Sequence, residues 1–119
     1  MRDHKSLEAW IEARAITCLV LHLSREHWRP YAAAVFHQLQ RASLSVQLNI
    51  AEGYALQSRA RFVNHLTMAY GSAVETAELL ELACAEGLFP TALGSEALAR
   101  NRRCQALLIG LLKRYRGQR

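Results

Sequence analysis

The segment QLQRASLSVQLNIAEG, which runs from Gln38 to Gly53, says more about the architecture than any other part of the chain. At about 100° of rotation per helical residue, its polar side chains fall within about 80° of one another. We call this set the polar ridge; on this segment it consists of Gln38, Arg41, Ser45, Asn49 and Glu52. A polar row within an otherwise apolar helix is expected to be hydrogen bonded inside the packing.

Two apolar arcs flank the polar ridge on the helical projection. The residues of the two arcs are Val35, Leu39, Ala42, Val46, Ile50 and Gly53 on one side and Leu44, Leu48 and Ala51 on the other. The remaining arc, which we expect to face solvent, contains Phe36, Gln40, Ser43 and Gln47. A helix that is apolar on two sides is expected to pack against partners in two directions.

Hydrophobic periodicity divides the 119 residues into four helices, with Pro30, Ser58 and Gly87 marking boundaries. The expected ranges are 7–26, 31–54, 59–86 and a last helix from Thr91 or Ser95 to just before Gly117. On the first helix the expected core stripe is Leu7, Trp10, Ile11, Cys18 and Leu21. Short connections make neighbouring helices antiparallel. The sequence therefore predicts a single all-α domain over 1–119, an antiparallel up-down-up-down four-helix bundle.

The turn between the second and third helices determines which residues face each other. A turn centred near residue 56 places Ser45 beside residues 69–72 and Arg41 opposite Glu75. We therefore expect an ion pair between Arg41 and Glu75, and we count Glu75 with the polar ridge.

Three further features of the sequence constrain the helix packing, the cofactors and the cellular location of the protein. Gly71 falls in mid-helix among small residues, where we expect it to permit the close approach of two helices. Cys18, Cys84 and Cys104 lack the spacing of a disulfide framework or a zinc site, so we expect free thiols, a cytoplasmic protein and no metal or other cofactor. The sequence has neither a signal peptide nor an apolar run long enough to span a membrane, so we expect no membrane association.

Charge is distributed unevenly along the chain, whose formal net charge is +5. Seven bases and no acid lie from Arg100 to Arg119, whereas the five acids from Glu75 to Glu96 have no base among them. Arginine outnumbers lysine thirteen to two, which fits bidentate contacts with phosphate or carboxylate groups and equally fits a GC-rich genome.

The polar ridge offers little for catalysis. Ser45 has no histidine on its face of the helix, and the five histidines are scattered without ligand spacing. We therefore expect no catalytic residue and no small-molecule substrate. The ridge is expected to be a structural network that fixes helix register and subunit geometry. The alternative is that Arg41, Asn49 and Glu52 recognise a buried ligand or a partner peptide.

The pattern Q-L-x-R-A-x-x-S-x-x-x-N-I-A-E-G, from Gln38 to Gly53, is followed by Phe62, by residues 69–72 (Ala-Tyr-Gly-Ser) and by Glu75. Together with Leu7 and Trp10 near the start, it resembles the bacterial four-helix-bundle family of proteins encoded in intervening sequences of large-subunit ribosomal RNA. The resemblance covers essentially the whole chain. It implies a closed homo-oligomeric ring, often a pentamer, and kinship with nucleic-acid-binding accessory proteins of diversity-generating retroelements.

The basic C-terminal segment is the expected contact surface for an external partner. The candidate nucleic-acid-binding residues are Arg100, Arg102, Arg103, Lys113, Arg114 and Arg116. In a ring of subunits these charges would be multiplied, which favours salt-dependent and weakly sequence-specific binding of RNA or DNA. The leading hypothesis is thus a non-enzymatic homo-oligomeric bundle that binds nucleic acid through basic surfaces. The alternative is an oligomeric protein-interaction scaffold without a nucleic-acid role.

Overall fold

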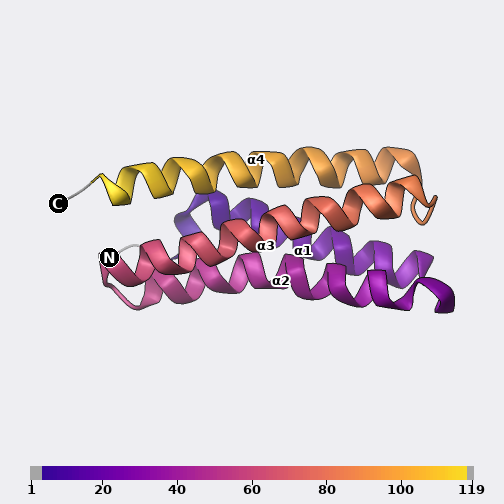
Figure 1. The fold of residues 1–119 in the computed structure, drawn as a ribbon, viewed down its shortest axis with the longest axis horizontal. Helices are drawn as coiled ribbons and strands as arrows, with labels where there is room; N and C mark the ends of the chain where they lie inside the picture. The colour runs from indigo at the N-terminus through magenta and orange to yellow at the C-terminus, as the bar shows by residue number, and fades with distance from the viewer. Residues whose placement is uncertain (1–3, 118–119) are drawn as a thin grey trace.

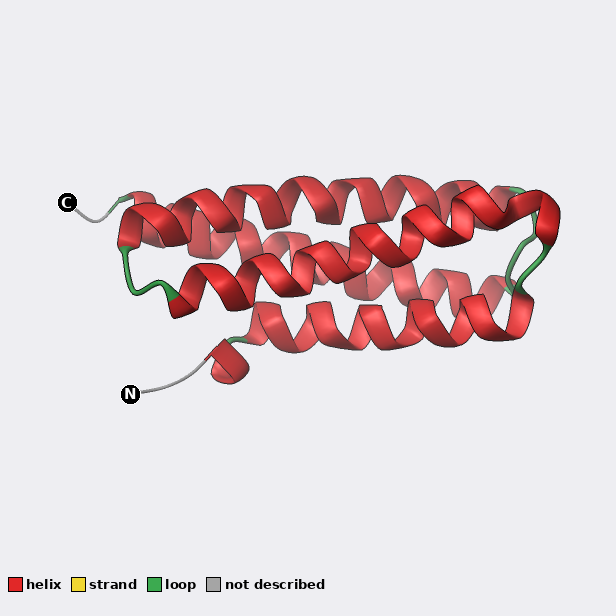
Figure 2. Ribbon diagram, turned by 90° about the horizontal axis from the view of Figure 1, so that it is seen from below, coloured by secondary structure: helices red, strands yellow, loops and turns green. Residues whose placement is uncertain are grey.

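The computed structural model describes residues 4–117, and four long helices make up most of it (Figure 1). The elements are η1 (His4–Ser6), α1 (Glu8–His27), η2 (Pro30–Ala32), α2 (Ala33–Ala55), α3 (Arg59–Ala85) and α4 (Thr91–Arg116). Within residues 4–117 there is no strand, and short connections join the helices (Figure 2). None of these helices combines the length and the apolar character that crossing a bilayer requires. The predicted all-α four-helix architecture is confirmed.

Local sequence explains where the helices begin and end. Arg29 has the extended backbone (φ −138°) typical of a residue before proline, and Pro30 then opens η2. Ser58 caps α3, because its Oγ accepts a hydrogen bond from the Arg61 backbone N–H at 3.3 Å. Gly87, just beyond α3, has a φ of +67°, which glycine adopts without steric cost. The helix boundaries predicted from these residues are confirmed to within a few positions.

The four helices form an up-down-up-down bundle 48 Å long and about 20 Å across. Each helix packs against two neighbours: α2 and α4 lie beside both α1 and α3. The beginning of α1, the turn between α2 and α3, and the end of α4 therefore lie at the same end of the bundle, as Figure 1 shows. This topology brings segments near residues 8, 56 and 116 together.

The buried face of α1 differs from the predicted stripe. Its buried apolar side chains are Ala9, Ala13, Ile16, Val20 and Leu23. The predicted core residues Ile11, Cys18 and Leu21 are instead exposed, Ile11 and Leu21 by 49% and 47%. The predicted core residues and the residues that are buried both recur at steps of three or four. The hydrophobic periodicity of α1 is therefore compatible with either set. The buried row contains more alanine, which lets α1 lie closer to its neighbours.

The outer face of α2 also differs from the prediction. Phe36 and Ser43, which were expected to face solvent, are buried. The Phe36 ring contacts the rings of Trp28 and Phe89, and the Thr17 hydroxyl of α1 donates to the Ser43 carbonyl oxygen at 3.3 Å. The exposed side of α2 instead carries Leu44 (43% exposed) and Leu48 (52% exposed). One of the two apolar arcs of α2 is therefore buried in the bundle, while the other is left on its surface.

Gly53, rather than Gly71, marks the close approach of two helices. A Cβ atom added to Gly71 would meet no atom within 4 Å, so the role predicted for Gly71 within the bundle is wrong. A Cβ atom added to Gly53 would lie 2.5 Å from the Cβ of His65 on α3. The tight packing of the end of α2 against α3 depends on the missing side chain of Gly53.

Candidate nucleic-acid interface and the polar ridge

The polar ridge lies along the contact between α2 and α3. The hydroxyl groups of Ser45 and Ser72 are hydrogen bonded at 2.9 Å, which is the register predicted from the turn. About two helical turns earlier on α2, the Gln38 amide donates to the Glu75 carboxylate at 2.5 Å. These two contacts join the middle of α2 to the middle of α3 through side chains that are only partly buried or exposed.

The polar residues of the NIAEG sequence converge on His65 of α3. The Asn49 side-chain oxygen lies 2.9 Å from His65 Nδ1, and the Glu52 carboxylate lies 3.6 Å from His65 Nε2. The Asn49 amide nitrogen donates to the Ser45 carbonyl oxygen at 2.9 Å, so its oxygen is the atom that faces the histidine. Gly53 completes the cluster by making room for the His65 side chain, which is only 13% exposed. Sequence reasoning missed His65, although the predicted hairpin register places it opposite Asn49.

Arg41 does not pair with Glu75. The Arg41 side chain is exposed, and among residues 4–117 it has no hydrogen bond or ion pair. The Gln38 side-chain amide donates to the Glu75 carboxylate instead, because Gln38 lies on the side of α2 that is nearer α3. The predicted ion pair is therefore wrong. Arg41 instead borders a shallow hollow of about 290 Å³ on the outer face of α2, lined also by Leu44, Ser45, Leu48, Asn49 and Glu52.

Three of the six candidate nucleic-acid-binding residues form ion pairs within the bundle. Arg100 and Arg103 both contact Glu12 of α1 at 3.4 Å, and Arg103 also contacts Glu8 at 3.6 Å. Arg102 lies 4.0 Å from Glu81 of α3. The positive charges of this part of α4 are therefore largely compensated by acids on the neighbouring helices.

The other three candidates lie in a separate basic surface at one end of the bundle. We define this surface, the basic end, as the exposed residues Arg59, Arg61, Lys113, Arg114 and Arg116. Within the described residues none of the five has an acidic partner. Arg116 donates to the Thr67 hydroxyl at 3.1 Å, and the Arg114 guanidinium lies 5.5 Å from the centre of the Tyr115 ring. Arg59 and Arg61 were not predicted, although an up-down-up-down topology places the start of the third helix beside the end of the fourth.

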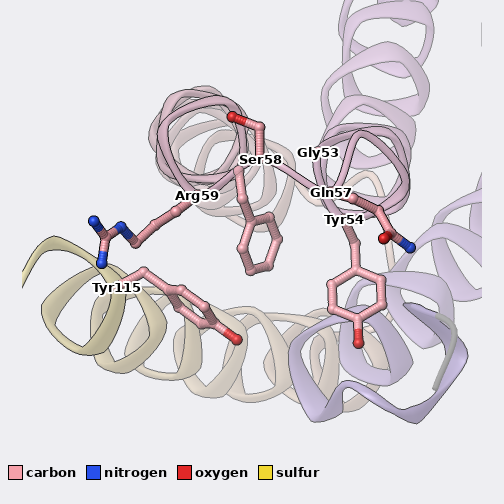
Figure 3. A pocket seen from close by; sticks show the side chains of 7 residues that line it. Gly53, Tyr54, Gln57, Ser58, Arg59 and Tyr115 are labelled. Carbon is pink, nitrogen blue, oxygen red and sulfur yellow. The ribbon is translucent and has the colours of Figure 1, made fainter. Parts of the chain in front are cut away.

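A pocket of about 350 Å³ opens at the basic end (Figure 3). We call it the aromatic pocket; its lining residues are Gly53, Tyr54, Gln57, Ser58, Arg59, Phe62 and Tyr115. The Phe62 ring is 4% exposed and meets the rings of Tyr54 and Tyr115 edge-on, with centroids 5.6 and 5.0 Å away. Aromatic surface and unpaired positive charge thus occur together at this place.

The cysteines are free thiols in three different environments. Cys18 is exposed, Cys84 is half-buried and Cys104 is buried. Burial raises the pKa of Cys84, and burial together with the nearby Glu12 carboxylate raises the pKa of Cys104 to about 12. The Cys104 thiol also donates to the Ala9 carbonyl oxygen at 3.6 Å. The raised pKa and the hydrogen bond both favour the protonated thiol of Cys104, which is the less reactive form.

Within residues 4–117, no group of three or more histidine, cysteine, aspartate or glutamate side chains is placed to hold a metal ion. Comparison with curated proteins found no match. The model of one protein family, described as the 23S rRNA-intervening sequence protein, matches residues 5–110. The match includes the polar ridge, His65 and Gly53; it covers α1, α2 and α3 and continues into α4 as far as residue 110, so the last turns of α4 lie beyond it. The chain therefore belongs to the family of 23S rRNA-intervening sequence proteins.

Proposed function

We propose that this protein is a non-enzymatic homo-oligomeric bundle that binds RNA or other nucleic acid through the basic end. The observation that carries the proposal is the contrast between two groups of bases on the same helix. Arg100, Arg102 and Arg103 are neutralised by acids, whereas Lys113 and Arg114 remain exposed without an acidic partner in the described part of the chain. A base that has no acidic partner can neutralise a phosphate and release counterions without first breaking an ion pair.

Charge is also separated along the long axis of the bundle. The basic end holds five bases, and the acids nearest to it are Glu8, which contacts Arg103, and Glu52, which contacts His65. The opposite half carries both signs: the acids Glu78, Glu81, Glu86 and Glu96, of which Glu81 and Glu96 pair with Arg102 and Arg100, and the bases Arg25 and Arg29. A phosphate backbone is therefore attracted more strongly to the basic end than to the opposite half.

The test compares two variants from which the same charge is removed. In the end variant, Arg59→Gln, Lys113→Gln and Arg114→Gln are combined. In the middle variant, Arg100→Gln, Arg102→Gln and Arg103→Gln are combined. Binding of a structured RNA is measured for both and for the wild type at several salt concentrations.

We expect the end variant to bind at least about tenfold more weakly and to have a salt dependence whose slope is reduced by roughly 0.9 per lost phosphate contact. The middle variant, with the same net charge, should keep most of the wild-type affinity. RNA affinity in the end variant equal to that of the wild type would overturn the proposal.

Self-association is proposed for the outer face of α2. Leu44 and Leu48 are about half exposed there, and the unpaired Arg41 borders the same hollow. Exposed leucines beside an unpaired guanidinium favour a surface that another copy of the chain covers. The resemblance to the family implies a closed ring, with five subunits as the expected number. The alternative is a scaffold for another protein, with the acidic third helix and the basic fourth helix as its docking surfaces.

The absence of catalysis is likewise a proposal, supported by how the polar ridge is used. Both ring nitrogens of His65 are directed at ridge residues, Nδ1 at Asn49 and Nε2 at Glu52. The nearest ridge hydroxyl, Ser45, is bonded to Ser72 and to the Asn49 amide. A nucleophile would need a base within hydrogen-bond reach of its hydroxyl group, and Ser45 has none among these partners.

A further inference from the structure

We propose that the aromatic pocket at the basic end holds one unpaired base of a bound nucleic-acid strand. This inference rests on the proposed nucleic-acid binding and specifies what part of the ligand the protein prefers. Electrostatic contacts alone would bind single and double strands alike, whereas a pocket with aromatic walls distinguishes a base that is free to leave its stack.

The walls of the aromatic pocket present ring surface rather than aliphatic surface. Phe62 packs against both tyrosines, and the rings of Tyr54 and Tyr115 meet it at interplanar angles of 71° and 79°. Both tyrosines are only partly buried, so part of each ring remains accessible. The cavity, about 350 Å³, lies in the range of roughly 300–1,000 Å³ that is usual for ligand pockets. It therefore has the size and the surface for a planar aromatic group.

The pocket is held open by the packing that the NIAEG sequence determines. Gly53 lines the pocket without a side chain, and no larger residue fits there because of His65. On the α4 side, the Arg114 guanidinium lies 5.5 Å from the Tyr115 ring centre, which keeps a positive charge against that ring. The pocket is thus a consequence of the same helix contact that fixes the hairpin.

Charge at the rim favours a nucleic-acid base over an apolar side chain of another protein. Figure 3 shows Arg59 and Tyr115 on one side of the pocket and Tyr54 on the other. Arg59 lines the pocket and has no acidic partner within the described residues, so it is available to a phosphate beside the inserted base. Arg61 and Arg114 add positive charge at the same end. An apolar peptide would leave these charges uncompensated, whereas a nucleotide brings its own anion.

The experiment uses the full chain and two RNA duplexes with the same number of phosphates. One duplex is blunt, and the other has fewer base pairs and a short unpaired overhang that carries the fluorescent base 2-aminopurine. Affinities are compared for the wild type, for Tyr115→Leu and Tyr54→Leu, and for the control Tyr31→Leu. Tyr31 is a matched control because it is 77% exposed and lies in η2 at the opposite end of the bundle.

We expect the wild type to bind the overhang duplex about tenfold more tightly than the blunt one. This is the gain in affinity expected when one base stacks on an aromatic side chain. Tyr115→Leu and Tyr54→Leu should each lose most of this preference while retaining the affinity for the blunt duplex. Tyr115→Phe, which keeps the ring, should retain the preference, as should Tyr31→Leu. The fluorescence of 2-aminopurine should change on binding to the wild type and not on binding to Tyr115→Leu.

The outcomes separate the two proposals. Equal affinity of the wild type for both duplexes, or a preference that persists in both leucine variants, overturns the base-binding pocket and leaves nucleic-acid binding in place. Failure of either duplex to bind overturns both. Thermal unfolding of each variant shows whether the bundle is intact, and the wild-type preference together with its fluorescence signal decides the question even if one variant does not fold.

Discussion

His65 is the residue of α3 that contacts both Asn49 and Glu52 of α2. Because the Asn49 amide nitrogen is used by Ser45, the Asn49 oxygen must accept, and His65 Nδ1 must therefore carry a hydrogen. Nε2 then faces the Glu52 carboxylate at 3.6 Å. In this arrangement the His65 side chain of α3 contacts Asn49 and Glu52 and lies against Gly53 of α2. A side chain at position 53 would collide with His65, so glycine is required there.

We predict that Asn49 and His65 are energetically coupled. Asn49→Ala and His65→Ala are made singly and together, and the free energy of unfolding is measured with urea. The coupling energy should be about 1 kcal/mol, the net value of one partly buried hydrogen bond. His22→Ala, which changes an exposed histidine of α1, serves as the control and should show no coupling to Asn49→Ala. Strictly additive effects of Asn49→Ala and His65→Ala would contradict this interpretation.

At the scale of the helices, Gly53 and Gly71 are opposite cases. Gly71→Ala should raise the free energy of unfolding by up to about 1 kcal/mol, because the site is an exposed helix interior with open space. Gly53→Ala should lower it by about 1–3 kcal/mol, because the new methyl group would push α3 away at His65. Denaturant unfolding of the two variants in parallel measures both effects. Stabilisation by Gly53→Ala would show that the α2–α3 contact is looser than described.

The helices themselves could be predicted well, whereas their orientations about their own axes could not. Pro30, Ser58 and Gly87 have strong local preferences that do not depend on distant contacts, so the boundaries followed from the sequence. The second half of α1 is apolar nearly all round, and its buried side was settled by fit against α2 and α4. For the same reason Leu21 was wrongly placed in the core.

The candidate site shows the same limit at the scale of the whole molecule. Sequence order grouped Arg100 with Arg116, whereas the structure pairs Arg100 with Glu12 and leaves Arg116 at the basic end. Ion pairs between helices depend on which faces meet, and a single sequence does not specify that. Arg59 joins the basic end because the topology places the start of α3 beside the end of α4.

A prediction about assembly belongs to the whole molecule. For the wild type, light scattering should give a mass at least twice the 13.4 kDa of a single chain. Leu48→Arg should shift the protein towards the monomer, because it places a charge in the proposed contact on α2. Ile109→Arg adds the same charge on α4, where the side chain is 37% exposed, and should leave the assembly unchanged. A monomeric wild type would rule out the proposed self-association.

Separation of charge along a rod 48 Å long gives the protein a permanent electric dipole. In the field of a polyanion such a rod experiences a torque that turns its basic end forward before any contact is made. At physiological ionic strength the Debye length is about 8 Å, so this alignment operates only over the last part of the approach. The pose of the protein on a phosphate-rich partner would then be selected during diffusion, before the first hydrogen bond forms.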